Sequence, residues 1–280
     1  MKLVETIAAL KQIVGQQKAT GKTIGFVPTM GALHQGHLSL VERAGAESDY
    51  VVVSIFVNPT QFNDPDDLKK YPRNLQADLD FLEDSPCQLV FAPSVDEIYP
   101  SPDTRIFDFG NIGNVMEGKH RPGHFNGVAQ VVSKLFDMIE PHKAFFGLKD
   151  FQQLAVIKNM VKQLELAIEI VPCPIVREPD GLAMSSRNVR LSAAERQSAA
   201  LISKALFEAR NNAKKYSVIE TIKNVVETIN SNEHLTTEYF EIVNDDDLMP
   251  IANWDDKPNK TGCIAVMCGN VRLIDNVSFS

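Results

Sequence analysis

Several features are scarce in this chain of 280 residues or missing from it. Its four cysteines form no C-x-x-C pair, so we expect free buried thiols and not a disulfide framework or a zinc ribbon. No segment reaches the roughly 18 uninterrupted apolar residues of a membrane span. The first residues, Met1–Ile7, lack the long apolar run of a secretory signal. We therefore expect a cytoplasmic protein without a membrane partner.

Positive charge is also in deficit. The chain has 28 Lys and Arg against 36 Asp and Glu, a formal net charge of −8. Because binding to a nucleic-acid backbone requires a basic face, this balance argues against a nucleic-acid partner. With 44% hydrophobic and 23% charged residues the composition is that of an ordinary globular protein. The length predicts one large domain with a smaller one beside it.

Short apolar runs alternate with helical patterns through the first two-thirds of the chain. This alternation predicts an α/β fold, with a mostly parallel sheet covered by helices on both faces. The predicted strands are 24–27, 50–57, 89–91, 106–109, 144–146 and 168–171, and the predicted helices are 5–18, 37–47, 74–84, 125–140 and 151–165.

The pattern changes at the turn-forming segment Glu178-Pro-Asp-Gly181. Two helical segments follow, at 192–214 and 217–231, and then three strand-like runs at 237–243, 262–267 and 271–278. We place a domain boundary near residue 176, which gives domains 1–176 and 177–280, the second of α+β type.

The most informative segment is Pro28-Thr-Met-Gly-Ala-Leu-His-Gln-Gly-His37, which joins an apolar strand to a helix start. Glycines let the backbone approach a ligand, and the N–H groups of a helix N-terminus attract phosphate. His34 and His37 can hydrogen-bond phosphate oxygens as charge builds on them. This predicts a nucleotide triphosphate site. Two alternatives stay open: two packed histidines, or a zinc site, although the H-E-x-x-H spacing is absent.

Two further segments carry groups suited to phosphate. Lys149 follows an apolar run and a glycine, and it is either a phosphate ligand or an exposed loop lysine. Polyphosphate oxygens can accept hydrogen bonds from the side chains of Ser185, Ser186 and Arg187. Alternatively, the two serines can cap the next helix. Gln61 and Gln153 suit a substrate that bears hydroxyl and carboxylate groups, because an amide both donates and accepts.

Six segments together resemble the pantoate–β-alanine ligases, the pantothenate synthetases. They are Pro28–His37, Phe56–Phe62, Tyr71-Pro-Arg73, Arg121–Phe125, Phe145–Gln153 and Gly181–Asn188. The His-x-x-His element alone would indicate only the wider nucleotidylyltransferase-like superfamily. The resemblance implies a Rossmann-like domain that binds ATP and pantoate, a smaller C-terminal lid domain and a homodimer. It also implies a reaction in which pantoate and ATP give pantoyl adenylate and pyrophosphate, after which β-alanine displaces AMP.

The resemblance also implies roles for single residues. His34, His37, Lys149, Ser185, Ser186 and Arg187 would be catalytic, through contacts to the phosphates. The ATP site would comprise Met30, Gly31, Ala32, Leu33, His34, Gln35, Gly36, His37, Gly147, Leu148, Lys149, Asp150, Val176, Met184, Ser185, Ser186 and Arg187. Gln61 and Gln153 would bind pantoate, and Tyr71, Arg121 and His124 would lie near the site. Mg²⁺ would accompany ATP with Asp78 as its protein contact, next to Ala77, where some relatives have an acid.

Three other functions are compatible with parts of the pattern. An adenylyltransferase would stop after nucleotidyl transfer and leave a stable adenylylated product. A histidine-dependent metal hydrolase would use zinc without ATP. A nucleotide-binding module without activity would bind but not react.

Overall fold

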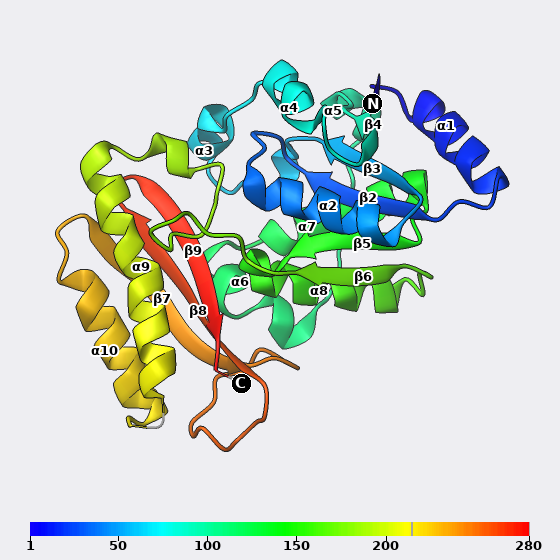
Figure 1. Cartoon of the computed structure of the whole chain (residues 1–280). Helices are drawn as coiled ribbons and strands as arrows, with labels where there is room; N and C mark the ends of the chain where they lie inside the picture. The colour runs from blue at the N-terminus through cyan, green and yellow to red at the C-terminus, as the bar shows by residue number, and fades with distance from the viewer. Residues whose placement is uncertain (214, 280) are drawn as a thin grey trace. The chain divides into compact units, whose positions relative to one another are not determined.

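The computed structural model of the chain describes residues 1–213 and 215–279 (Figure 1). The contacts divide the chain into two compact units. The first comprises Met1–Phe109, Arg121–Leu148 and Gln153–Pro174, and the second comprises Gly110–His120, Lys149–Gln152 and the residues from Ile175 onward. Two short segments, Gly110–His120 and Lys149–Gln152, therefore belong to the second unit although segments of the first unit flank them in the sequence.

The first unit is built on a six-stranded sheet in the order β1-β4-β3-β2-β5-β6, and each neighbouring pair is parallel. The strands are β1 (Lys2–Val4), β2 (Ile24–Thr29), β3 (Tyr50–Ile55), β4 (Cys87–Phe91), β5 (Lys143–Gly147) and β6 (Glu169–Cys173). From β4 to β6 this is the 3-2-1-4-5 order of doubly wound folds, in which the direction of winding reverses between β2 and β5. Ligands of such sheets bind beyond the carboxyl ends of the strands at this reversal.

Helices cover both faces of this sheet because successive strand residues point to opposite sides. Val27 and Phe145 pack with α2 (Gln35–Glu47), whereas Phe26 packs edge-on against Phe136 of α7 (His124–Ile139), with ring centroids 6.2 Å apart. The other helical segments placed in this unit are α1 (Ile7–Ala19), η1 (Pro59–Gln61), α3 (Pro65–Lys70), α4 (Leu75–Leu82), α5 (Val95–Ile98) and most of α8 (Phe151–Gln163).

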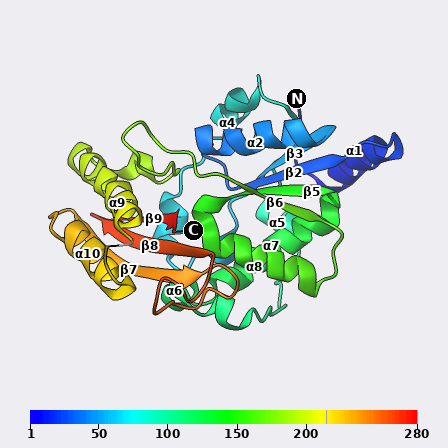
Figure 2. The same ribbon diagram turned by 60° about the horizontal axis from the view of Figure 1, so that its bottom comes forward.

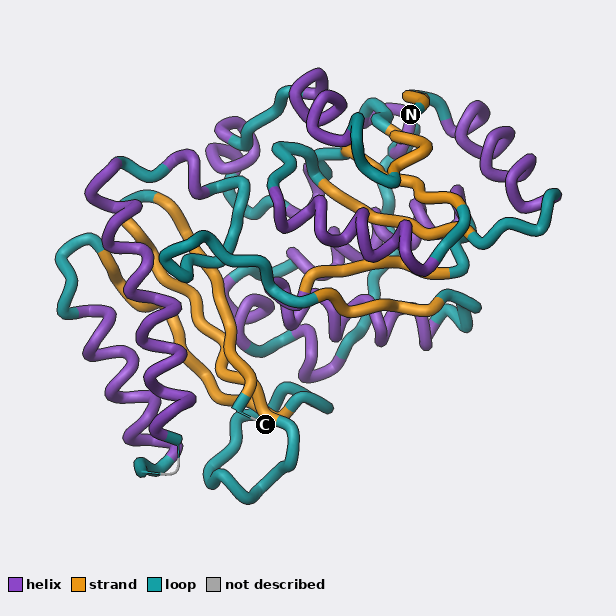
Figure 3. Tube along the Cα trace, in the orientation of Figure 1, coloured by secondary structure: helices purple, strands orange, loops and turns teal. Residues whose placement is uncertain are grey.

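The second unit contains an antiparallel three-stranded sheet, β7-β8-β9. Its strands are β7 (Leu235–Asn244), β8 (Lys260–Cys268) and β9 (Val271–Ser278), and its long helices are α9 (Ala193–Asn212) and α10 (Val218–Asn230). Figure 2 shows α9 and α10 side by side against this sheet, where they bury an apolar core. Short helical segments η2 (Gly110–Gly113), α6 (Met116–His120) and η4 (Asn188–Arg190) complete the unit. The segment η3 (Leu148–Asp150) begins with Leu148 of the first unit and ends in the second. The loop 245–259 joins β7 to β8 (Figure 3).

The predicted α/β fold with a smaller α+β part is confirmed, and most predicted elements lie within a few residues of the observed ones. The strand predicted at 106–109 is wrong. Ile106 is 89% exposed, and the Phe107 N–H binds the Asn126 side chain instead of a neighbouring strand. Residue 214, the last of a predicted helix, lies outside the described residues. The boundary at residue 176 and the lid role stay predictions.

Candidate active site

The turn after β2 is held in shape by one buried carboxylate. Asp78 of α4 is 4% exposed, and its Oδ1 and Oδ2 accept the backbone N–H groups of Leu33 at 2.7 Å and Ala32 at 3.0 Å. Burial raises the pKa of Asp78, while these two hydrogen bonds act in the opposite direction. The protein contact of Mg²⁺ predicted at Asp78 stays a prediction, since the observed role of this carboxylate is to hold the turn.

The backbone of the same turn takes a left-handed course. Gly31 has φ +77° and Ala32 has φ +49°. A Cβ on Gly31 would lie 2.8 Å from Asp78 Oδ2 and 3.0 Å from Ile55 Cγ2. Glycine at position 31 therefore satisfies both the conformation and the close approach of Asp78.

His34 and His37 form a reciprocal cap at the start of α2. Helix α2 begins at Gln35, so His34 is its N-cap residue and not a member of the helix. His34 Nδ1 accepts the Gly36 N–H at 3.1 Å, and His37 Nδ1 accepts the His34 N–H at 3.3 Å. The two ring centroids are 4.1 Å apart. The histidines are therefore structural caps, and their rings are also brought together.

The capping bonds determine the tautomer of both rings. An imidazole nitrogen that accepts an N–H carries no proton, so each neutral ring holds its proton on Nε2. Both side chains can therefore donate a hydrogen bond from Nε2 without becoming charged. The N-terminus of α2 adds a partial positive charge at this place. The arrangement suits an anionic ligand with oxygen acceptors.

Gln61 is oriented by a second group of contacts within the first unit. Its Nε2 donates to Met30 Sδ at 3.1 Å, and its Oε1 accepts the amide of Asn58 at 3.2 Å. Its carbonyl oxygen lies 2.8 Å from His124 Nδ1 and accepts a hydrogen bond from Arg121 Nη2 at 3.4 Å. Met30 and Gln61, both predicted site residues, are thus brought together.

Lys149 and the residues from Val176 to Arg187 belong to the second unit. The side chain of Lys149 is 20% exposed and its Nζ lies 3.7 Å from Asp150 Oδ1, so it is not a fully exposed loop lysine. Val176 and Met184 face each other, because the Met184 N–H donates to the Val176 carbonyl at 3.0 Å. Ser185 Oγ accepts the Arg187 N–H at 3.2 Å. The alternative that these serines cap the following helix is wrong, since Ser192 caps α9.

The predicted site residues thus fall into two sets, each placed within one unit. Gly147 is the last residue of β5, the neighbour of β2 in the sheet, and Leu148 follows it directly. Gln153 lies in the first turn of α8. The first unit holds Met30, Gly31, Ala32, Leu33, His34, Gln35, Gly36, His37, Gln61, Asp78, Gly147, Leu148 and Gln153, and the second holds Lys149, Asp150, Val176, Met184, Ser185, Ser186 and Arg187.

Sequence reasoning missed the buried polar residues that support these sets. Asn58 is 1% exposed, and its amide also donates to the Gly127 carbonyl at 3.1 Å. Asp275 is 4% exposed, and both of its oxygens accept hydrogen bonds from Arg177, at 2.6 and 2.9 Å. The only local signal was a polar pair, Asp275-Asn276, inside an apolar strand pattern.

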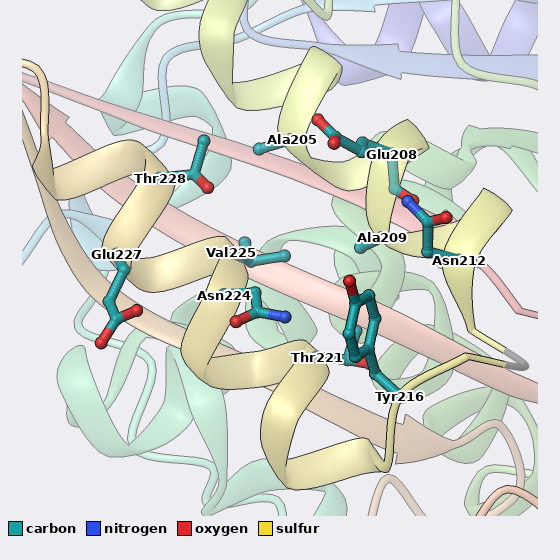
Figure 4. A pocket seen from close by; sticks show the side chains of 10 residues that line it. All are labelled: Ala205, Glu208, Ala209, Asn212, Tyr216, Thr221, Asn224, Val225, Glu227 and Thr228. Atoms are coloured by element: carbon teal, nitrogen blue, oxygen red, sulfur yellow. The ribbon is translucent and has the colours of Figure 1, made fainter.

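A separate groove lies between α9 and α10, with a volume of about 340 Å³ (Figure 4). Glu208, Glu227, Tyr216 and Thr221 are among its lining residues, and no predicted site residue belongs to that lining. Within the described part of the chain, no group of three or more His, Cys, Asp or Glu residues is placed to hold a metal ion. No helix among residues 1–213 and 215–279 has the length and apolar character needed to cross a membrane.

A doubly wound sheet in which the turn after β2, at the winding reversal, carries glycine and two capping histidines has the architecture of a nucleotide-binding α/β enzyme. Comparison with known proteins gives the particular family. The family model for pantoate–β-alanine ligase matches residues 2–278. The chain belongs to the pantoate–β-alanine ligase family, whose enzymes join their two substrates through an amide bond.

Individual relatives agree over their full length. The chain is 58% identical over 280 residues to the pantothenate synthetase of Phocaeicola vulgatus, covering 100% of this chain and 99% of the relative. It is 56% identical over 279 residues to that of Porphyromonas gingivalis, with the same two coverages. The crystal structure of pantothenate synthetase from Thermus thermophilus has a TM-score of 0.94 at 42% identity, covering 100% of this chain and 99% of that one.

A further crystal structure carries ligands. It is the pantoate–β-alanine ligase of Francisella tularensis in complex with β,γ-ATP and β-alanine. Its TM-score is 0.85 at 37% identity, and the match covers 100% of this chain and 98% of that one. These relatives are ligases, which decides against a metal hydrolase and against a binding module without activity.

Proposed function

We propose that the chain condenses pantoate with β-alanine at the expense of ATP, in two steps. In the first, a pantoate carboxylate oxygen attacks the α-phosphorus of ATP, and the bond from that phosphorus to the bridging oxygen breaks, releasing pyrophosphate. In the second, the neutral amine of β-alanine attacks the carbonyl carbon of pantoyl adenylate. The carbon–oxygen bond to AMP breaks, the amine loses a proton, and pantothenate and AMP are released.

The observation that carries this proposal is the pair of histidines at the start of α2. Their Nδ1 atoms accept backbone N–H groups, so their Nε2 atoms are donors at neutral pH. A carboxylate attacking a phosphate meets like-charge repulsion, and the first step therefore depends on donors and cations that are already in place. We assign His34 and His37 to the ATP phosphates. The carboxylate needs no general base, because it is ionised at neutral pH.

The remaining roles follow the same electrostatic logic. Lys149 and Arg187, with the hydroxyls of Ser185 and Ser186, balance charge on the α-phosphate and the leaving pyrophosphate. Gly147, Asp150, Val176 and Met184 frame adenosine, and the backbone between Met30 and His37 lines the phosphates. Gln61 and Gln153 bind the hydroxyl and carboxylate groups of pantoate. The position of Gln61 against Met30 supports its assignment.

The proposal includes Mg²⁺, which enters with ATP and neutralises phosphate charge when bound. The described residues do not offer a protein cage for it, because Asp78 uses both oxygens on the turn and no acidic cluster stands beside it. We therefore assign no step to a protein-bound metal. The proposal further includes a homodimer, which light scattering would detect as twice the 31.1 kDa of one chain. A cytoplasmic location is supported by the use of ATP and by four free cysteines.

The test separates the two steps. The chain is incubated with ATP, Mg²⁺ and pantoate, and pyrophosphate is measured. β-Alanine is then added, and pantothenate and AMP are measured. We expect pyrophosphate without β-alanine, and pantothenate with AMP only after its addition. Pyrophosphate that appears only when β-alanine is present would contradict the order of steps. A stable adenylylated product in the presence of β-alanine would favour an adenylyltransferase instead.

A further inference from the structure

The main chain at Lys149 is fixed by an asparagine far away in the sequence. The side-chain amide of Asn276 in β9 donates to the Lys149 carbonyl at 3.1 Å. The two residues belong to the same unit, and Asn276 is 7% exposed. A hydrogen bond in such a buried place is screened little by water, and its loss would leave the carbonyl without this partner.

Asn276 is itself held by its neighbour. The Asp275 carboxylate accepts the Asn276 backbone N–H at 2.7 Å and two hydrogen bonds from the Arg177 guanidinium. Arg177 Nη2 also donates to the Asn276 carbonyl at 3.2 Å. Both the donor and the acceptor of the Asn276 backbone are therefore tied to one buried ion pair. This ion pair leaves residue 276 little freedom to shift.

The same ion pair also contacts the segment of this unit that contains the predicted site residues Val176 and Met184. Arg177 Nη1 donates to the Gly181 carbonyl at 3.1 Å, and Arg177 pairs with Ala183 in an isolated bridge next to Val176 and Met184. The guanidinium also supplies the positive charge that the buried Asp275 requires. Because Arg177 neutralises this carboxylate, the charge of Lys149 is not needed for that purpose.

From these contacts we infer that Asn276 is a positioning residue for Lys149. It holds the main chain at 149 so that the flexible side chain starts from a fixed point, with Arg177 and Asp275 as its support. Placement matters because displacement of a reacting group by about 1 Å can cost about 10²-fold in rate. The inference rests on the proposed function, in which the Lys149 ammonium binds the phosphates.

The experiment is a double-mutant cycle on pyrophosphate release, with Asn276→Ala, Lys149→Ala and the double variant. We expect Asn276→Ala to lower kcat about tenfold or more, with little change in KM for pantoate. In the Lys149→Ala background the second substitution should change kcat less than about twofold, because the group that it positions is gone. Asn244→Ala is the matched control. Asn244 is 4% exposed, ends β7 and bonds to its own turn, so its loss should leave kcat unchanged.

Circular dichroism and thermal unfolding show whether each variant is folded. If Asn276→Ala does not fold, Asn276→Asp replaces it, since aspartate keeps the shape but cannot donate to the Lys149 carbonyl when ionised. Equal loss of kcat from Asn276→Ala in both backgrounds would overturn the inference and indicate general damage. Wild-type kcat in Asn276→Ala, beside a large loss in Lys149→Ala, would overturn it and leave the proposed function intact. Wild-type kcat in Lys149→Ala would overturn the inference and remove Lys149 from the assigned phosphate contacts, while the proposed reaction itself would stand.

Discussion

The buried carboxylate of Asp78 accepts the backbone N–H of Leu33 at 2.7 Å, and this contact joins α4 to the turn that leads into α2. Its second oxygen accepts the N–H of Ala32. An anion at the N-terminal side of a helix is favourable, and two charge-assisted bonds hold the turn before any ligand arrives. The histidines that follow are therefore preorganised by a residue that sequence reasoning had assigned to a metal.

Removing this carboxylate should loosen the turn. For Asp78→Ala we expect the free energy of unfolding to fall by about 1–3 kcal/mol, because two backbone N–H groups lose their partner in a buried place. Pyrophosphate release should fall as well. The control is Asp80→Ala on the exposed side of the same helix, which should change stability by less than about 0.5 kcal/mol. Urea unfolding measures the free energy of unfolding of both variants. Equal losses in the two variants would contradict the role of Asp78 in holding the turn.

Gly31 should tolerate no side chain. Alanine at this position would keep φ near +77° and place its Cβ 2.8 Å from Asp78 Oδ2. We expect Gly31→Ala to destabilise the chain by about 1–3 kcal/mol and to raise the KM for ATP. Gly15→Ala in α1 is the opposite case, since nothing lies within 4 Å of its added Cβ, and it should stabilise by about 0.5–1 kcal/mol. Thermal unfolding of the pair should show shifts of opposite sign.

His37 should contribute through the donor on its Nε2. For His37→Ala we expect the kcat of pyrophosphate release to fall about 10²–10³-fold, the loss typical of one preorganised donor to a developing anion. His142→Ala is the control, because His142 Nδ1 also accepts a backbone N–H, that of Ile24 at 2.9 Å, but at the other end of β2. The His142→Ala substitution should lower the free energy of unfolding and leave the kcat of pyrophosphate release unchanged. A His37→Ala enzyme with near wild-type kcat would remove His37 from the mechanism.

Much of the fold is predictable from the chain because its signals are local. The runs around Phe26, Val52 and Phe145 are apolar on both sides, which is the mark of strands buried in a parallel sheet, and they lie in β2, β3 and β5. The segment 106–109 shows the limit of this rule. Phe107 and Phe109 alternate as in a strand, and their rings stack at 6.0 Å, but the Phe107 N–H binds a side chain instead of a partner strand.

The predicted site residues were found from motifs that are short in sequence, such as His34 and His37. The contacts that hold these motifs were not predicted, because they join residues far apart along the chain; Asp78 itself was predicted, but as a metal contact and not as the support of the turn. Asp78 and Leu33 are 45 positions apart, and Asn276 and Lys149 are 127 positions apart. A contact of this kind leaves no periodicity or spacing in the local sequence. Only the folded structure shows which buried polar residue serves which loop.

The buried thiols predict a loss of stability at alkaline pH. Burial raises the pKa of Cys87 to about 12 and that of Cys173 to about 11, from an ordinary value of 9.0. A thiol with a raised pKa in the folded state keeps its proton, whereas the unfolded chain releases it above pH 9. Above that pH the unfolded state binds fewer protons, so the free energy of unfolding falls as pH rises.

Replacing one thiol tests this dependence. Cys173→Ala should reduce the slope of the free energy of unfolding against pH between pH 9 and about 11, when urea unfolding is compared with the wild type across that range. The reason is that alanine has no proton to release from the unfolded chain. An unchanged slope would show that the Cys173 thiol does not contribute to the loss of stability at alkaline pH.

The buried pair of Glu117 and Arg272 should anchor α6 to the sheet of the second unit. Glu117 is 7% exposed, and its oxygens accept bonds from Arg272 at 2.6 and 2.8 Å and from the Tyr239 hydroxyl at 2.8 Å. Burial raises the pKa of Tyr239, which keeps this hydroxyl a donor. Arg272→Met would leave the Glu117 charge buried without its guanidinium, and we expect a loss of about 3–5 kcal/mol in the free energy of unfolding.

Two matched variants complete this comparison. Glu238→Gln removes the other carboxylate that contacts Arg272. The Glu238 side chain is 28% exposed, so this substitution should lower the free energy of unfolding by less than about 1 kcal/mol. Glu117→Met combined with Arg272→Met removes both charges and should recover much of the loss, because no unpaired charge remains. Limited proteolysis gives a local measure, since release of α6 in Arg272→Met should expose 110–120 to cleavage. Equal losses in Arg272→Met and Glu238→Gln would show that Arg272 acts at the surface and not through Glu117.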